Sequence, residues 1–156
     1  MANHNVRAFA CPAFYSFPRD SQTNMPNLKT HLTTGAAVAG GANLIYQLFK
    51  LYDSAQPPAT LWEALTRVKW GRVGVFAVAG GAIAALPDLL EPADHPNHRA
   101  LLHSVCCGGA LTYGAFGEHS ERWPDDNKHA IRTGALAYLS HLALDAGTPK
   151  SLPFIA

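Results

Sequence analysis

Four apolar stretches rich in Ala, Leu and Gly constrain the fold of this chain more than any other feature. Each is about as long as a helix of a globular protein, and none alternates apolar and polar residues as a half-buried strand does. Asn-Gly and Asp-Gly dipeptides, which signal tight hairpins, do not occur in the sequence. The sequence therefore predicts an all-α bundle of four main apolar helices. These stretches are Gly35–Phe49, Val73–Leu86, Leu101–Phe116 and Ile131–Ala146.

Residues with helix-capping and helix-breaking chemistry separate the stretches. Asn27, after a proline, is expected to start the first helix, and Pro57 follows its end. Pro124 is expected to precede the fourth helix, and Gly147 to end it. A shorter amphipathic helix with Trp and basic residues is expected over Thr60–Arg72.

The length of the chain, 156 residues, fits one domain with a core of its own. Residues 1–26 mix prolines, aromatics and polar residues without a period. They also lack the basic start and continuous apolar run of a signal peptide. We therefore predict an irregular N-terminal arm over residues 1–26 and one helical domain over residues 27–156.

The charge balance and the cysteines exclude several classes of protein. The chain has 12 basic and 11 acidic residues, so we predict no specific nucleic-acid binding. Its three cysteines, two of them adjacent, are not the even, spaced set of a secreted disulfide scaffold. A reducing compartment or a membrane interior suits them better. Cys107 is expected to be a small buried residue more than a metal ligand.

A membrane location and a soluble one are both open from the sequence. The stretches have 14 to 16 residues, fewer than the about 20 that a spanning helix needs. Three of them carry an internal Gly-Gly pair, although Gly costs about 1 kcal/mol inside a helix. Close approach between helices would explain these pairs, and membrane bundles favour it. From the residues we expect a protein embedded in or attached to a membrane, with a cytoplasmic location as the alternative.

Ionisable residues lie at the ends of the apolar stretches, where burial is costly unless they are paired or coordinated. Asp88 and Glu91 are three residues apart after the second stretch, so they share a helix face and repel each other. A bound cation would relieve that repulsion, whereas a solvated helix end needs no ligand. His141 and Asp145 are one turn apart in the fourth stretch, which suits a shared metal ion or a private hydrogen bond.

A third group of ionisable residues surrounds the start of the third stretch. His98 and Arg99 precede it, and His103 lies within it. Because a helix N-terminus favours anions, Arg99 is a candidate for holding a phosphate oxygen. His31 stands in a similar place near the start of the first stretch. Each histidine taken alone is equally well explained by an ordinary hydrogen bond.

Together these groups place a histidine or a carboxylate at the end of each of four apolar helices. A bundle can bring such groups together at one end, as helical metalloproteins do. The sequence therefore predicts one or two divalent ions, Zn, Mn or Mg, held by nitrogen and oxygen donors. The predicted metal ligands are His31, Asp88, Glu91, His98, His103, His141 and Asp145.

At these residues the chain resembles the predicted membrane-bound, metal-dependent hydrolases of bacteria (DUF457-like), and more distantly zinc phospholipase C and P1 nuclease. The chain departs from that pattern where family members often have a second Asp, because Leu90 stands there and Glu91 follows. The resemblance implies an α-helical metal-dependent hydrolase of the bacterial inner membrane, integral or peripheral, and leaves its substrate open. It rests on Pro87-Asp88, His98-Arg99, His103-Ser104, Ser140-His141, Asp145 and Thr148-Pro149.

We expect a metal-bound water to attack a phosphorus or carbonyl centre. A phosphoester is the favoured substrate, either a small molecule or a lipid. Glu91 or Asp145 would accept the proton, and Arg99 would stabilise the developing negative charge. The alternative is a non-enzymatic helical membrane or adaptor protein whose metal site is structural.

Overall fold

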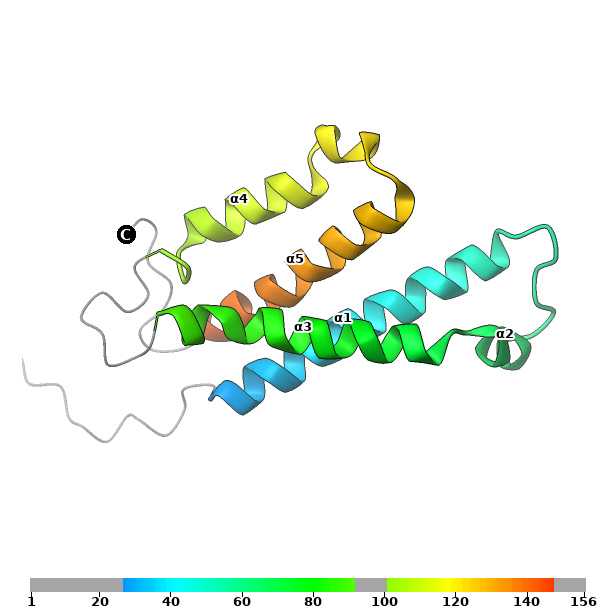
Figure 1. Ribbon diagram of the computed structural model, residues 1–156, viewed down its shortest axis with the longest axis horizontal. Coiled ribbons are helices and arrows are strands. Elements are labelled where there is room, and N and C mark those ends of the chain that lie inside the picture. The colour runs from blue at the N-terminus through cyan, green and yellow to red at the C-terminus, as the bar shows by residue number, and fades with distance from the viewer. Residues whose placement is uncertain (1–26, 92–100, 148–156) are drawn as a thin grey trace, which may run out of the picture.

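The computed structural model describes residues 27–91 and 101–147. No β-strand occurs in these two ranges, so the all-α prediction is confirmed. The predicted arm, residues 1–26, lies outside the described residues. The elements, shown in Figure 1, are α1 (Leu28–Tyr52), α2 (Leu61–Arg67), α3 (Trp70–Leu90), α4 (Val105–Phe116), the short 3-10 helix η2 (Glu118–Arg122) and α5 (Asp125–Ala146).

Glycines let α1 and α3 pack backbone against backbone. Gly80 of α3 faces Gly35 of α1 so closely that a Cβ added to Gly80 would lie 2.7 Å from the Gly35 carbonyl oxygen. A Cβ added to Gly81 would lie 2.9 Å from the carbonyl oxygen of Leu32. The Gly-Gly pair of α3 therefore allows α1 and α3 to pack closely. The packing offsets the low helix propensity of the two glycines.

The other two Gly-Gly pairs use one glycine each in this way. Gly40 faces α3 and Gly108 faces α5, whereas a Cβ added to Gly41 or to Gly109 would meet no atom within 4 Å. Close approach thus explains four of the six paired glycines among the described residues.

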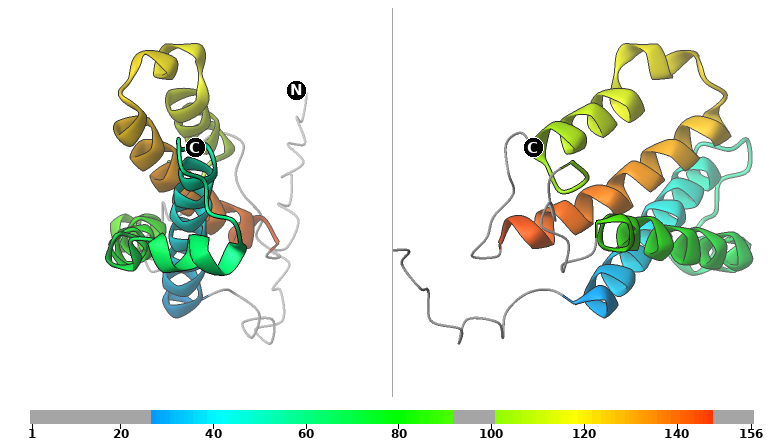
Figure 2. Two further views of the ribbon diagram at one scale, coloured as in Figure 1. Left: turned by 90° about the vertical axis from the view of Figure 1, so that its right-hand side faces the viewer. Right: turned by 60° about the vertical axis from the view of Figure 1, so that its left-hand side comes forward.

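The second half of the chain forms an antiparallel hairpin of α4 and α5 joined by η2 (Figure 2). Arg132 of α5 fixes the hairpin, because its Nε donates to the Ala115 carbonyl at 3.2 Å and its guanidinium pairs with Glu121. α5 also packs on α1 and α3, whereas α4 packs mainly on α5. α4 therefore stands to one side of the α1–α3 pair (Figure 2).

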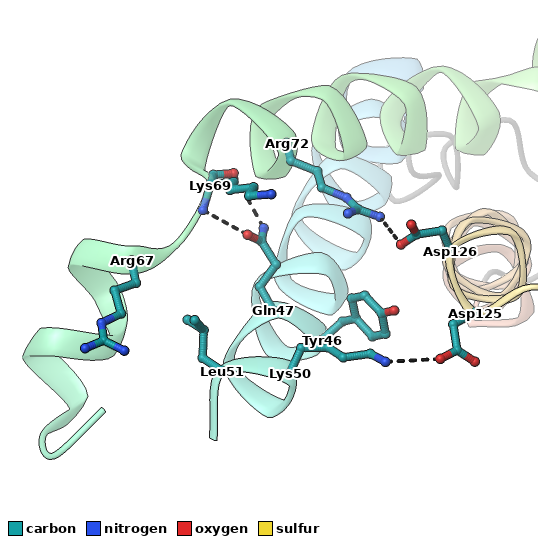
Figure 3. A pocket seen from close by; sticks show the side chains of 9 residues that line it. All are labelled: Tyr46, Gln47, Lys50, Leu51, Arg67, Lys69, Arg72, Asp125 and Asp126. Atoms are coloured by element: carbon teal, nitrogen blue, oxygen red, sulfur yellow. Dashed lines mark hydrogen bonds and ion pairs between the residues drawn. The ribbon is translucent and has the colours of Figure 1, made fainter. Parts of the chain in front are cut away.

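The short helix predicted over Thr60–Arg72 is present, but its predicted end is wrong, because the chain breaks there into two helices. α2 ends at Arg67, and Trp70 begins α3. The side chain of Gln47 in α1 stabilises the non-helical backbone at the break. Its Oε1 accepts the Lys69 amide at 2.8 Å, and its Nε2 lies 3.5 Å from the Lys69 carbonyl oxygen (Figure 3). This contact comes from another helix, so the local pattern of residues does not reveal it.

The start of α4 also differs from the prediction of a helix from Leu101. α4 begins at Val105, because the Oγ of Ser104 accepts the Cys107 amide at 3.1 Å and so caps the helix. His103 therefore lies in the turn before α4 and not inside a helix.

Among the described helices, α3 is the one whose length and composition would allow it to cross a membrane. Core helices of soluble proteins meet the same criterion, but only 28% of the most apolar part of α3 is buried. Its side chains Val75, Val78, Leu89 and Leu90 are exposed by 62% to 76%. Contiguous exposed apolar surface of this kind is typical of a face that meets protein, lipid or an apolar ligand.

Candidate metal centre

Five ionisable side chains meet where the N-terminal end of α1, the C-terminal ends of α3 and α5 and the start of α4 come together (Figure 1). His31 lies in the first turn of α1, and His103 lies just before α4. Asp88 lies in the last turn of α3, which continues past the predicted end to Leu90. His141 and Asp145 are one turn apart near the end of α5.

The distances between the donor atoms of this cluster fall in a narrow range. From Asp145, the nearest Nε2 atoms are those of His31 and His141, both at 3.5 Å, and that of His103 at 3.6 Å. From Asp88, the Nε2 of His103 lies at 3.3 Å, and those of His31 and His141 lie at 3.8 Å. Three imidazoles therefore direct the same nitrogen, Nε2, at the same two carboxylates.

The cluster is buried except at Asp88. His31, His103, His141 and Asp145 are exposed by 2% or less, whereas the side chain of Asp88 is 27% exposed. Among the described residues, Nδ1 of His31 and both ring nitrogens of His141 have no hydrogen-bond partner. A buried polar atom without a partner costs about 1–3 kcal/mol. The cluster thus has the composition of a site that a cation completes.

The geometry fits donors that surround one ion. Zn²⁺ lies about 2.0–2.2 Å from nitrogen and oxygen ligands, which places neighbouring donors about 3–4 Å apart. Donor atoms of His31, Asp88, His141 and Asp145 all lie within 4.8 Å of one another. The Nε2 of His103 is not a member of this mutual set, but it lies 3.3 Å from Asp88 and 3.6 Å from Asp145. Direct charge-assisted hydrogen bonds are shorter, about 2.7–2.9 Å. The contact of 3.3 Å between the Nε2 of His103 and Asp88 is within hydrogen-bond range, whereas the longer distances between the other donors favour coordination over direct pairing.

Glu91 holds His103 from the side away from the cluster. Its Oε2 lies 3.0 Å from the Nδ1 of His103, and its Oε1 accepts the backbone amides of Leu101 and Leu102 at 3.1 and 3.0 Å. A proton on Nδ1, donated to Glu91, leaves the lone pair of Nε2 directed at the cluster. A carboxylate on the second nitrogen is a common way to orient a metal-binding histidine.

The surroundings give these groups different protonation behaviour. Burial and the neighbouring His31 lower the pKa of His141 to about 4. Burial also opposes the charged form of His103, but hydrogen bonds with Asp88 and Glu91 outweigh it and raise the pKa of His103. Burial opposes ionisation of Glu91, but its bonds with His103 and the two amides outweigh it and lower its pKa. His141 is thus neutral at pH 7, as metal binding requires.

The structure brings together five of the seven predicted metal ligands. Glu91, the sixth, contacts the cluster through the Nδ1 of His103. His98 and the predicted catalytic residue Arg99 lie outside the described residues. Cys107 lies apart from the cluster, with its Sγ 3.5 Å from the hydroxyl of Tyr138.

A second buried polar cluster was missed by sequence reasoning. Asn43 is fully buried, its Oδ1 accepts the Nε2 of Gln47 at 2.8 Å, and its Nδ2 lies 2.9 Å from the Nε2 of His129. Together with the Lys69 contact of Gln47, which Figure 3 shows, these bonds join α1, the residue before α3 and α5. Two amides one turn apart in an apolar helix were the available signal. Because the amides find protein partners, a structural role explains them.

Glu91→Ala should weaken metal binding about 10- to 100-fold, because His103 loses the group that fixes its ring. Glu91→Gln should weaken it less, since the amide oxygen still accepts from Nδ1. Competition with a chelating dye measures the affinity, and Glu118→Ala, at an exposed position, is the control. Unchanged affinity in Glu91→Ala would contradict the role given to Glu91.

The metal-free protein should lose stability as the pH falls from about 6.5 to about 4 because of His141. In this window the unfolded chain protonates His141, whereas the folded chain, with a pKa of about 4, does not. The loss amounts to up to about 3 kcal/mol. His103 acts oppositely, since its raised pKa stabilises the folded state at low pH and this contribution is lost as the pH rises through that pKa.

The contribution of His141 is isolated by comparing wild type with His141→Asn in urea unfolding across this pH range. The variant should show a smaller loss of stability on acidification, while the exposed His119→Asn should behave as wild type. Identical pH dependence in wild type and His141→Asn would show that His141 is not held neutral by its surroundings.

The chain matches none of the protein-family models, curated proteins or solved structures with which it was compared.

Proposed function

We propose that this protein is a metal-dependent hydrolase that holds one divalent ion through His31, Asp88, His103, His141 and Asp145. The observation that carries the proposal is the convergence of three Nε2 atoms on two carboxylates at 3.3 to 3.8 Å. Helical bundles build metal centres from facing helices in this manner. A phosphoester is the substrate class that the sequence resemblance favours.

The donor set favours Zn²⁺ or Mn²⁺. Mg²⁺ prefers oxygen ligands and retains much of its water, so three imidazoles suit it poorly. With neutral histidines, the two carboxylates balance the charge of a divalent ion. A balanced centre is less costly to bury than either carboxylate alone.

Asp88 is assigned to the side of the centre that faces the substrate, because it is the most exposed of the five residues. A divalent ion supplies two effects, a lower pKa of water and polarisation of a phosphoryl oxygen. Asp88 is placed to orient the attacking water and to accept its proton. Glu91 is less available as a base than Asp88, because its oxygens already bind His103 and two backbone amides. We therefore assign Glu91 to positioning His103.

A structural metal site is the second candidate, and the number of donors favours it. Structural zinc sites are closed by four protein ligands, whereas catalytic sites keep an open position. Five protein donors would close the sphere of Zn²⁺, unless one carboxylate moves away or the ion accepts a sixth ligand. The partial exposure of Asp88 favours the catalytic alternative.

Substitution with Co²⁺ separates the two candidates. In a hydrolase, inorganic phosphate should change the visible spectrum of the bound Co²⁺, and the Mn²⁺ or Zn²⁺ protein should hydrolyse bis(para-nitrophenyl) phosphate. Asp88→Asn should lower that rate more than it lowers metal content. A spectrum unaffected by phosphate, together with no hydrolysis by the fully loaded protein, would assign the ion a structural role.

Membrane association is part of the same proposal, supported by the exposed apolar side chains of α3. Co-flotation of the purified protein with phospholipid vesicles tests it.

A further inference from the structure

An apolar groove of about 690 Å³ lies between α3, α4 and α5. Its floor on α5 consists of Ile131, Gly134, Ala135 and Tyr138, and its walls are α3 and α4, which stand apart in Figure 1. Ligand sites in proteins have volumes of about 300–1,000 Å³. The groove is therefore large enough for a bound molecule.

The floor of the groove leads to the metal centre along one face of α5. Ile131, Gly134 and Tyr138 are followed, at the same helical spacing, by His141 and Asp145. At 1.5 Å per residue, Ile131 and His141 are separated by about 15 Å along the helix axis. The Tyr138 end of the groove is thus the end nearer to the cluster along α5, and the Ile131 end is about 15 Å from His141.

The wall on the α4 side also runs from the cluster to the far end of the groove. Leu102, which precedes His103 in the chain, lines the groove, and its carbonyl accepts the Tyr138 hydroxyl at 2.6 Å. Further along α4, Gly114 lines the far part of the groove together with Trp123. The antiparallel pairing of α4 with α5 places this part beside the first turns of α5.

The lining suits a hydrocarbon chain. Aliphatic and small side chains dominate it, and the hydroxyl of Tyr138 already donates to Leu102. Leu86 and Ile131, which line the groove, are 42% and 44% exposed. Covering such side chains with hydrocarbon is favourable by about 25 cal/mol per Å² of apolar surface.

We infer that this groove binds the hydrocarbon chain of a lipid phosphoester whose phosphate lies at the metal centre. The inference rests on the proposed function and adds its substrate class, an amphiphile with an anionic head and one long chain. The head complements a divalent ion, and the chain covers the apolar floor that continues from His141. The two halves of the molecule thus match two adjoining surfaces of opposite character.

Quenching of Trp123 tests the position of the chain without depending on catalysis. Trp62→Phe and Trp70→Phe leave Trp123 as the one tryptophan of the three in the chain. Dodecyl phosphate brominated at the chain tip should quench it saturably, with a Kd at least about tenfold below that of bromoethyl phosphate. Adding Zn²⁺ should tighten binding of the long-chain phosphate.

Two glycines of α4 provide a matched pair of variants. Gly114 lines the groove and Gly109 does not, and at both positions an added Cβ would meet no atom within 4 Å. Gly114→Leu should raise the Kd of the brominated dodecyl phosphate about tenfold or more by filling the far part of the groove. Gly109→Leu should leave it unchanged, and circular dichroism should show that both variants fold.

Hydrolysis separates failure of this inference from failure of the proposed function. The metal-loaded protein should cleave dodecyl para-nitrophenyl phosphate with a higher kcat/KM than the ethyl ester. Gly114→Leu should remove this difference, and Gly109→Leu should keep it. Equal cleavage of both esters, with no quenching of Trp123, would overturn the inference and leave the hydrolase intact. Cleavage of neither ester would overturn the proposed function.

A Gly114→Leu variant that alters only the oligomeric state in size-exclusion chromatography would show that the groove is a contact between copies, and the inference would be wrong.

Discussion

Metal-free protein supplied with Zn²⁺ or Mn²⁺ is expected to unfold at a temperature about 10 °C higher than without the ion. The donors come from α1, α3, α5 and the turn before α4, so an ion bound to them exists only in the folded chain. Binding to the folded state alone stabilises it by about 4 kcal/mol when the ion is at a thousand times its Kd. Circular dichroism of chelator-treated protein across a metal titration measures the shift. Mg²⁺ should produce a smaller one.

Asp145→Asn should abolish most of the rise in unfolding temperature that the metal ion produces. Asp145 is 2% exposed and its oxygens lie 3.5 to 3.6 Å from all three Nε2 atoms, so it is central to the donor set. The amide is nearly the same size but lacks the charge that balances the ion. Asp126→Asn, at an exposed position on the same helix, is the matched control and should respond to metal as wild type does.

The outcome for the wild type and Asp145→Asn decides whether the cluster is a metal centre. A wild type that binds no Zn²⁺ or Mn²⁺ by elemental analysis after dialysis, and gains no stability from either, would contradict it. An equal thermal shift in Asp145→Asn would place the ion elsewhere.

Gly80→Ala is expected to destabilise the protein by about 3 kcal/mol, although alanine is the better helix former. Its Cβ would lie 2.7 Å from the carbonyl oxygen of Gly35 and would also press against the Cβ of Ala39. Both neighbours belong to the backbone or to a side chain without rotamers, so α1 and α3 must move apart. Chemical denaturation measures the change in the free energy of unfolding.

Gly74→Ala is the matched control on the same helix. A Cβ there would meet no atom within 4 Å, so the substitution should stabilise α3 by up to about 1 kcal/mol. If Gly80→Ala were as stable as Gly74→Ala, the close approach of α1 and α3 would be refuted.

The helices and the identity of the converging residues could be predicted from the sequence because both depend on local chemistry. Asn27 caps α1 as expected, with its side chain accepting the Thr30 amide at 3.0 Å, and Pro124 directly precedes α5. The cost of burying ionisable groups in apolar helices was enough to single out His141 and Asp145, which prove to be fully buried. Their use as metal ligands is still a prediction.

Glu91 shows why the details of the site could not be predicted. Its distance of three residues from Asp88 suggested a shared ion. In the fold, the turn before α4 packs against Glu91. The carboxylate of Glu91 therefore binds the Nδ1 of His103 and two backbone amides of that turn. Which of two nearby carboxylates faces the three Nε2 atoms depends on where a distant segment places its donors.

The sequence by itself determined the all-α class, the number of main helices and the polar residues that their apolar surroundings make costly, because helix propensity, caps and burial act over a few residues. Only the tertiary structure decided the break between α2 and α3 at the side chain of Gln47, the contact of Glu91 with His103 and the groove between α3, α4 and α5. Each of these depends on contacts between segments far apart in the chain, where the geometry of packing, and not local preference, sets the lower free energy.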